Sequence, residues 1–446
     1  MENIKKTQVD YPYLERPVEI YERANGHKIV FAYKKSELIN ISSWVKTGSI
    51  NENNENNGIS HFLEHLMFKG TSKHKAGEFD RTLEGRGGVV NAATWKDYTF
   101  YYVTIPRGSD ERNFNDTLEL HADMMLDPIV PDEEIGAPFD VENPEVKNKR
   151  ERHVVIEEIR MRKDQPWTKV YNQLNANMYT SHPYRRDVIG TDKIISTVTR
   201  EDVLNYYKEF YTPNNITTIV VGDLDFEKIL PQICNEFDFK GRENRELTNY
   251  DIDEPTKETK YVESFSKIKT GFLMFGYLGA KSNEIKACTI QEIICLVLAQ
   301  GQSSRLYQEL IEKKKDSIFN VVASDYYHFK DGGSLLIEAN FKPEHKDEAI
   351  AQIKEQIEKI CEEGITEQEL KKAKKKLKAS FAENSETISD IAENIGFYMT
   401  VCDGLERVQE YTQTIENITL EEVNSSIKDC LDISHAVISV LLPEQN

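Results

Sequence analysis

Alternating apolar and polar side chains mark two stretches in the N-terminal part of the chain. Residues 17–47 alternate with a period of two, and residues 89–105 are rich in β-branched and aromatic side chains. Residues 73–85, which lie between them, place Phe79 and Leu83 at helical spacing. A period of two is typical of strands with one buried face, and spacings of three or four residues are typical of amphipathic helices. The pattern therefore predicts strands in both stretches and a helix between them.

Helical spacing dominates the residues that follow. An amphipathic helix is predicted at residues 110–126, and His121 falls on its apolar side. We expect this histidine to be a packed or a capping residue and not to bind a metal. Three more helices are predicted, and after them a short buried strand, at residues 149–162, 167–178, 199–211 and 215–222.

A weak internal repeat links the middle of the chain to its end. Residues 195–203 correspond to residues 415–423, and each segment is followed by an amphipathic helix and a final strand. Self-similarity of this kind indicates that one structural unit occurs twice. We therefore expect an α+β fold of two homologous halves, each a mixed sheet packed with helices. The expected boundaries are an N-terminal half at 1–240, a polar linker at 241–262 and a C-terminal half at 263–446.

Composition places the chain among globular proteins. Of its 446 residues, 39% are hydrophobic and 30% are charged, and its apolar runs are far shorter than a membrane span. The N-terminus has no apolar stretch of the secretory type. The 6 cysteines are scattered without CxxC spacing, which is typical of reduced thiols. We expect a cytoplasmic protein with no membrane partner.

The chain is strongly acidic, with a formal net charge of -20. Nucleic acid is excluded as an expected partner, because nucleic-acid-binding proteins carry basic surfaces. The acidity has two interpretations that the sequence leaves open, namely solubility or attraction of basic peptides. The lysine-rich stretch at 371–378 has apolar residues at helical spacing, so we interpret it as the solvated face of a helix.

The stretch with the clearest chemistry is His61-Phe62-Leu63-Glu64-His65. Residues four apart lie on one face of a helix, so both imidazoles can reach one metal ion. This is the H-x-x-E-H order, in which Glu64 is available as a base. Zinc accepts histidine nitrogen and carboxylate oxygen and, in catalytic sites, keeps one position for water. The motif predicts a zinc site held by His61 and His65.

A catalytic zinc site needs a third protein ligand, and the helix predicted around residues 151–160 offers candidates. Glu151 and Glu158 are seven residues apart, which places them two turns apart on one side of that helix. The pattern by itself favours an ordinary charged helix with solvated glutamates. The spacing alone leaves both interpretations open.

Three segments resemble the motifs of the pitrilysin and mitochondrial-processing-peptidase family of inverzincin metallopeptidases, namely residues 61–71, 87–94 and 151–159. The likeness is closest to bacterial processing-peptidase-like members. It implies that Glu158 is the third zinc ligand and that Glu151 supports the site without binding the metal. Glu157 is the alternative ligand, but it is displaced by about 100° around the helix, so only one of the two can point at the metal.

The resemblance also implies how a substrate would bind. In the family, a peptide lies as an added strand on a sheet edge, near the residues that match Asn91 and Ala92. Such strand addition holds an extended peptide without demanding one sequence. Phe68 is expected either to line the pocket for the residue after the scissile bond or simply to pack beneath the metal helix. Two similar chains commonly face each other in the family, each forming one side of a clamshell chamber, so we expect a dimer.

Two departures from the family pattern stand out. Residues 132–148 form an insertion between the two metal helices, which could reshape the entrance to the site. Active members also carry an Arg and, seven residues later, a Tyr that help to bind the substrate carbonyl. Those positions fall here on Ile311 and on Ile318, or Phe319 with a shift of one residue. The helix predicted at 283–298, which matches the metal helix, has no histidine, so the C-terminal half cannot rebuild the zinc site.

Together these features predict a zinc-dependent endopeptidase acting on short or unfolded peptides, with Glu64 as the base. The alternative is a non-catalytic or partner-dependent subunit of a heterodimer, whose paralogous partner carries the Arg/Tyr pair. Metal-dependent chemistry on something other than peptides is a third possibility that rests on the motif alone.

Overall fold

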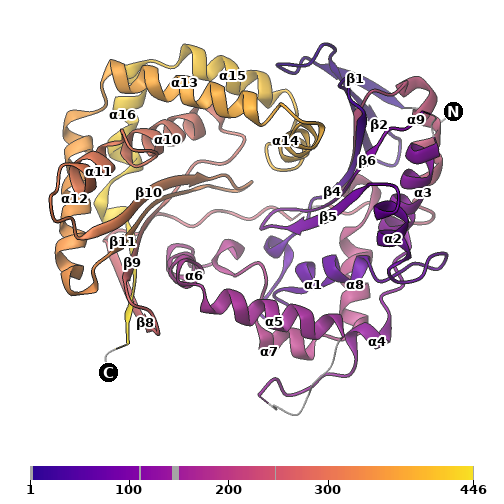
Figure 1. The fold of residues 1–446 in the computed structure, drawn as a ribbon, viewed down its shortest axis with the longest axis horizontal. Helices are drawn as coiled ribbons and strands as arrows, with labels where there is room; N and C mark the ends of the chain where they lie inside the picture. Colours follow the sequence, from indigo (N-terminus) through magenta and orange to yellow (C-terminus); the bar gives the residue numbers. More distant parts are fainter. Residues whose placement is uncertain (1–3, 110–111, 143–149, 247, 445–446) are drawn as a thin grey trace. The chain divides into compact units, whose positions relative to one another are not determined.

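Two compact units make up the computed structural model, which describes residues 4–109, 112–142, 150–246 and 248–444 (Figure 1). Each unit combines one mixed sheet with helices, which confirms the predicted α+β fold of two halves. Each unit is built from several chain segments. Unit 1 comprises Met1–Arg160, Asp187–Thr248 and Ala382–Gln409, and unit 2 comprises Met161–Arg186, Asn249–Phe381 and Glu410–Asn446.

Unit 1 contains a 7-stranded sheet in the order β1-β2-β3-β7-β4-β6-β5. Only the β3–β7 pair is parallel among its strand pairs in the described residues, and β5 lies at one edge. The strands are β1 (Lys5–Val9), β2 (Val18–Glu22), β3 (Lys28–Tyr33), β4 (Leu38–Val45), β5 (Val89–Thr94), β6 (Thr99–Pro106) and β7 (Ile216–Gly222).

The helices of unit 1 include both helices that carry the predicted metal ligands. They are η1 (Ser49–Asn51), α1 (Ile59–Met67), α2 (Glu78–Glu84), α3 (Arg112–Leu126), α4 (Asp132–Ile135), α5 (Glu151–Asp164), α7 (Asp192–Thr197), α8 (Arg200–Phe210), η3 (Pro213–Asn215), α9 (Phe226–Glu236) and α14 (Ile388–Thr400). The last turn of α5 already belongs to unit 2.

Unit 2 contains a 5-stranded sheet in the order β10-β11-β9-β12-β8, with β12 and β8 parallel. Its strands are β8 (Lys260–Ser266), β9 (Gly271–Leu278), β10 (Phe319–Tyr327), β11 (Ser334–Phe341) and β12 (Val437–Pro443). Its helices are α6 (Pro166–Met178), η2 (Pro183–Arg185), α10 (Ile285–Leu298), α11 (Arg305–Tyr307), η4 (Gln308–Glu312), η5 (Pro343–His345), α12 (Lys346–Glu363), α13 (Glu367–Glu383), α15 (Arg407–Asn417), α16 (Leu420–Cys430) and η6 (Ile433–His435).

The internal repeat has a local physical basis at the helices before the last strand of each sheet. Thr199 begins α8 and Thr419 begins α16, and each threonine forms a capping box with the acidic residue three positions later. A capping box satisfies backbone N–H groups that have no partner inside the helix. In each half the capped helix leads into an interior strand of the sheet, β7 or β12, that has one parallel and one antiparallel neighbour.

Two corresponding helices are exchanged between the units. Helix α6 comes from the N-terminal half but packs on β9 and β12, whereas α14 comes from the C-terminal half and packs on β4 and β7. Helix α6 lies on the sheet face opposite the main helical layer of unit 2: its Leu174 meets Gly276 of β9, whereas the neighbouring Phe275 and Tyr277 point to the other face and pack in the core. The units therefore differ from the contiguous halves expected at 1–240 and 263–446.

The contact between α14 and β4 is close. A β-carbon added to Gly396 would lie 1.9 Å from Cε2 of Trp44, so the missing side chain lets the helix approach the indole ring. Trp44 is 1% exposed and stacks on Phe100 with ring centroids 4.4 Å apart. On the other face of β4, Ser43 lies 2.9 Å from Nε2 of His121. His121 is therefore a packed core histidine, as predicted.

Two predicted helices differ at their starts. Helix α2 begins at Glu78 and not at residue 73, because the Thr71 hydroxyl accepts the backbone N–H groups of Lys73 and His74 and holds a turn there. Helix α3 is described from Arg112, since residues 110–111 lie outside the described residues. Residues 143–148 of the expected insertion also lie outside them.

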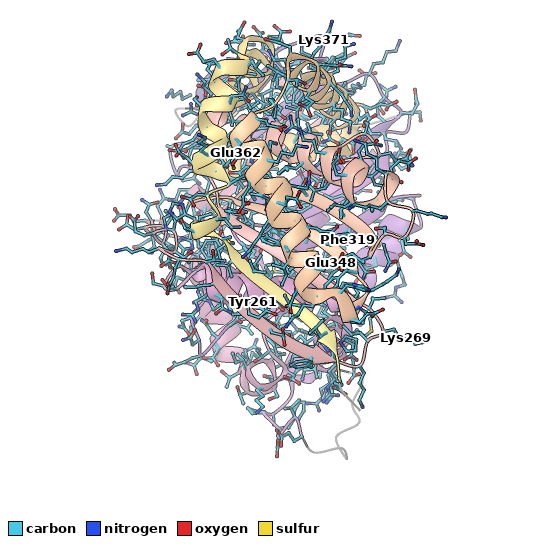
Figure 2. All side chains as sticks on the ribbon, turned by 90° about the vertical axis from the view of Figure 1, so that its left-hand side faces the viewer. Tyr261, Lys269, Phe319, Glu348, Glu362 and Lys371 are labelled. Carbon is cyan, nitrogen blue, oxygen red and sulfur yellow. The ribbon has the colours of Figure 1, made fainter. Side chains whose placement is uncertain are left out.

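The lysine-rich segment belongs to α13, as predicted for the solvated face of a helix. Its buried residues recur at helical spacing, at Leu370, Ala373, Leu377 and Phe381. The outward faces of α12 and α13 carry exposed charged side chains, among them Glu348, Glu362 and Lys371 (Figure 2). Within the described residues, no helix has the length and apolar character needed to cross a membrane.

Candidate metal centre

Two helices of unit 1 bring together the three residues expected to bind zinc. His61 and His65 lie one turn apart on α1, and Glu158 lies on α5. Oε2 of Glu158 is 3.7 Å from Nε2 of His61 and 3.5 Å from Nε2 of His65. One ligand atom from each residue lies within 4.8 Å of the others, and no other such group occurs in the described part of the chain.

This arrangement fits a zinc ion. Ligand atoms at 2.0–2.1 Å from a tetrahedral metal are roughly 3.3 Å from one another, close to the observed separations. Two imidazoles and one carboxylate are also the chemical types that a catalytic zinc takes, with one position left for water. His61, His65 and Glu158 would therefore hold the metal.

The start of α1 is fixed by a buried acid in the preceding loop. The carboxylate of Glu52 accepts hydrogen bonds from the backbone N–H groups of Gly58, at 2.8 Å, and Ser60, at 2.9 Å. It also accepts from Asn57 Nδ2 at 2.8 Å and from the Ser60 hydroxyl. Gly58 has a φ of 96°, and an added β-carbon would lie 2.5 Å from the carbonyl oxygen of Ile189. These contacts fix the first residues of α1, which directly precede His61.

Helix α5 is fixed by a buried arginine whose guanidinium donates to backbone carbonyl oxygens. The guanidinium of Arg152 donates to the carbonyl oxygens of Gly136, Ile195, Ser196 and Val198 at 2.6–3.2 Å. Burial, and after it the charge of Arg150, lowers the pKa of Arg152 to about 10. Glu134, in the first part of the insertion, accepts the backbone N–H of Glu151 at 3.0 Å. The start of the insertion thus helps to place the helix that carries Glu158.

Glu151 orients one of the ligands. Its Oε1 lies 2.9 Å from Nδ1 of His65, which leaves Nε2 of that ring for the metal. Its Oε2 lies 2.5 Å from Nζ of Lys69. A carboxylate on the far nitrogen of a metal-binding histidine sets the tautomer and the ring orientation. Lys69, Glu151 and His65 therefore form a continuous chain of contacts that ends at the predicted metal position.

Without a cation, this acidic surrounding favours protonated His65. Burial lowers the pKa of His65, but the hydrogen bonds to Glu151 and Glu158 and the charge of Glu64 outweigh it and raise the value to about 9. For Glu151, burial raises the pKa of the carboxyl group, but the contacts with His65 and Lys69 lower it by more. The pKa of Glu151 is therefore below its usual value. A divalent cation bound to Nε2 would replace the imidazole proton as the positive charge.

Glu64 is close to the two histidines but is not part of the ligand group. Its side chain is buried, and Thr94 Oγ1 donates a hydrogen bond of 2.5 Å to its Oε2. The hydroxyls of Tyr101 and Tyr211 lie 2.7 Å apart. Burial raises the pKa of both phenols, and the Glu64 charge raises them further. Both tyrosines therefore stay neutral near a carboxylate that can accept a proton.

The other predicted site residues are placed as follows. Glu157 is directed to solvent, where it pairs with Arg160 at 2.6 Å, and is not in the ligand group. Asn91 is exposed on edge strand β5, and its side chain accepts the backbone N–H of Ala92 at 2.9 Å. Phe68 packs against Phe79 and Tyr101, with ring centroids 6.0 and 6.1 Å away. This contact is the packing role that the sequence left open for Phe68.

In unit 2, Cys288 and Glu292 lie on α10, the helix that matches α1. Glu292 pairs with His328 at 3.0 Å, but no metal-ligand group forms there among the described residues. Arg305 is bound by Glu369, with both contacts at 2.7 Å. Ile318 is 8% exposed and packs in the core of the unit, and Ile311 packs against the same core.

Sequence reasoning missed Glu52, Lys69, Thr94 and Arg152. The acidic loop before α1 was the only available signal for Glu52, because a helix start needs acceptors for its backbone N–H groups. The partners of Lys69, Thr94 and Arg152 lie 82, 30 and 16 or more residues away, so local pattern carries no signal for them.

Two sequence profiles of one family match successive parts of the chain. The sequence profile described as "Insulinase (Peptidase family M16)" matches residues 28–192, and the profile "Peptidase M16 inactive domain" matches residues 197–377. The "Uncharacterized zinc protease YmxG" of Bacillus subtilis is 27% identical over 434 residues, 96% of this chain and 99% of that protein. The "Zinc protease PqqE" of Helicobacter pylori is 30% identical over 386 residues, 85% of this chain and 82% of that protein.

A solved structure agrees over the whole length. The crystal structure of a protease from Helicobacter pylori has a TM-score of 0.84 and 25% sequence identity, and the match covers 99% of this chain and 100% of that chain. Fold and site together define a two-unit α+β protein with a candidate metal-ligand group in its first unit. The chain belongs to the insulinase family, peptidase family M16.

Proposed function

We propose that the chain is a zinc-dependent endopeptidase that hydrolyses short or unfolded peptides. The observation that carries the proposal is the group of His61, His65 and Glu158 with Glu64 buried beside it and outside it. The names of the relatives, which are zinc proteases, support the choice of metal. The thiols of Cys288, Cys295, Cys361 and Cys430 are compatible with the cytoplasmic setting that we propose.

Zinc bound by the three ligands would act as a Lewis acid and lower the pKa of a water molecule in the remaining position. Glu64 accepts the proton of the attacking water and later donates it to the leaving amine, so that one water is consumed for each bond cleaved. Glu151 and Lys69 keep the ring of His65 in the orientation that exposes Nε2.

The edge strand beside the site supports the substrate class that we propose. In the part of the chain that the structure describes, β5 pairs with β6 and with no other strand, and Thr94 at its end contacts Glu64. An extended peptide that paired with the free edge of β5 near Asn91 and Ala92 would lie close to Glu64. Backbone pairing requires an extended segment, which a folded protein does not offer. We therefore propose peptides and unfolded segments as substrates.

A specific observation favours a second candidate, a partner-dependent subunit. The positions of the Arg/Tyr pair of active relatives carry Ile311 and Ile318, and the neighbouring Arg305 is already bound by Glu369. An aliphatic side chain cannot donate a hydrogen bond to a developing oxyanion, and loss of one such donor costs about 100- to 1000-fold in rate. We propose that a paralogous chain supplies the pair in a heterodimer that encloses the substrate.

The test combines metal content with peptide cleavage by the purified chain, alone and together with a paralogue that carries the Arg/Tyr pair. We expect one zinc per chain and cleavage that Glu64→Gln abolishes without loss of zinc. Glu157→Gln is the matched control and is expected to leave both unchanged. Turnover that survives Glu64→Gln would overturn the mechanism, and full activity of the isolated chain would overturn the heterodimer.

A further inference from the structure

We propose that Thr94 is a positioning residue that holds the Glu64 carboxylate away from the metal, so that Glu64 acts as a base and does not become a fourth protein ligand. The inference rests on the proposed function, because it concerns the same site. It assigns a role to a side chain on the strand that borders the site, which neither the motif nor the ligand group includes.

The contact itself has a defined direction. Thr94 is the last residue of β5, on the side of the strand that faces α1, and its Oγ1 lies 2.5 Å from Oε2 of Glu64. An ionised carboxylate can only accept hydrogen bonds, so the threonine hydroxyl donates. Hydrogen bonds to charged groups are stronger than those between neutral groups. The Glu64 carboxylate is therefore bound through one oxygen by a strand that does not carry a ligand.

Glu64 needs such a restraint because of its position. It follows His61 by three residues and directly precedes His65 on α1, and its side chain is buried. A carboxylate and a divalent cation attract each other strongly where water is scarce. The ligand group nevertheless uses the carboxylate of Glu158, which comes from another helix. A Glu64 oxygen on the metal would take the position of the water and remove the base.

Thr94 is itself held in place. It pairs with Thr99 across the β5–β6 hairpin, and the two hydroxyl oxygens lie 3.4 Å apart. Thr99 Oγ1 lies 3.0 Å from the carbonyl oxygen of Thr47. A β-branched side chain also has few χ1 rotamers, so its hydroxyl keeps one direction. The restraint on Glu64 is thus anchored in two strands of the sheet, β5 and β6.

The experiment uses the purified full chain with Co²⁺ in place of zinc, since the visible spectrum of Co²⁺ reports its ligands. The variants are Thr94→Val, which keeps the shape and removes the hydroxyl, and Thr94→Ser, which keeps the hydroxyl. The matched control is Thr104→Val, the same change at the far end of the hairpin, where the hydroxyl contacts Asn40. Zinc affinity is measured by chelator competition, and kcat and KM are measured on a peptide that wild type cleaves.

For Thr94→Val we expect an altered Co²⁺ spectrum, zinc binding tighter by about tenfold, and kcat lower by about tenfold or more with KM unchanged. Thr94→Ser and Thr104→Val are expected to match wild type. The double variant with Glu64→Gln is expected to return to the wild-type spectrum, because the new ligand is gone. A merely structural role for Thr94 would not produce that reversal.

An unchanged spectrum and unchanged zinc affinity in Thr94→Val, with metal bound by wild type, would overturn this inference and leave the proposed function standing. If Thr94→Val does not fold, Thr94→Ala is measured in its place with the same expectation. Wild-type chain that binds neither Co²⁺ nor zinc would overturn the proposed function and this inference together.

Discussion

At the scale of single residues, the contact between Glu151 and His65 predicts that the proposed zinc affinity depends on a side chain outside the ligand group. The variant Glu151→Gln keeps the size but removes the charge that pairs with Lys69 and polarises His65. Replacing such a partner typically costs 10–100-fold in metal affinity, so we expect the Kd for zinc to rise by about 10–100-fold. Chelator competition measures the change. Equal affinities for Glu151→Gln and wild type would contradict this role, and exposed Glu157→Gln is the control.

Glu338, which is far from the candidate metal ligands in the sequence, makes the stability of the fold depend on pH. Burial, and after it the charge of Asp325, raises the pKa of Glu338 from 4.5 to about 7. The folded state therefore binds this proton more tightly than the unfolded state does, and stability falls as pH rises from about 4.5 to about 7. Below this window Glu338 is protonated in both the folded and the unfolded state, so its burial does not lower stability. Above the window it is ionised in both states, and burial of the charge lowers stability by its full amount.

The variant Glu338→Gln removes this titration. We expect it to raise the free energy of unfolding by about 1–3 kcal/mol at pH 8 and to change it little at pH 4.5. Urea unfolding of both proteins at the two pH values measures the difference. The control is Glu355→Gln, on the exposed face of α12. A stabilisation of equal size at both pH values would show that burial of Glu338 is not the cause.

At the scale of elements, the approach of α14 to β4 depends on one glycine. A β-carbon at Gly396 would overlap the indole of Trp44, which is fully packed between the helix and the sheet. Forcing extra atoms into a packed core costs about 1–3 kcal/mol, so we expect Gly396→Ala to lower the stability of unit 1 by this amount. Thermal unfolding measures it.

A compensating change separates overlap from helix propensity, because alanine by itself favours a helix over glycine. In a background with Trp44→Leu, which removes the indole, Gly396→Ala is expected to be neutral or stabilising. If Gly396→Ala destabilises both backgrounds equally, the close contact with Trp44 is not its cause.

At the scale of the whole molecule, the exchange of α6 and α14 predicts that neither half of the sequence folds independently. A fragment of residues 1–240 lacks α14, so Trp44 and Phe100, now 1% and 8% exposed, would face water. We expect this fragment to aggregate or to lose its near-UV circular dichroism. A peptide of residues 382–409, added in trans, is expected to restore the signal, whereas a peptide of residues 407–430 is the control. A cooperatively folded, monodisperse fragment without the peptide would contradict the prediction.

Local geometry explains which parts of the fold and site could be predicted from the sequence. His61 and His65 share a face because any helix places residues four apart on one side. The caps at Thr199 and Thr419 likewise act within one turn, so the repeat was visible as a pattern. The hydrophobic pattern was less informative about where a helix begins when a side chain binds the nearby backbone. The hydroxyl of Thr71 delayed the start of α2 in this way.

By itself, the sequence determined the H-x-x-E-H helix, the two related halves and the acidic character of the chain, because each depends on residue order or composition alone. Glu158 came from a resemblance, since its distance to His61 depends on how α1 and α5 pack. Only the tertiary structure decided that Thr94 contacts Glu64, that Lys69 reaches Glu151 and that α6 and α14 change units. These contacts join segments far apart in the chain, and packing of the complete sheets, not local preference, selects them.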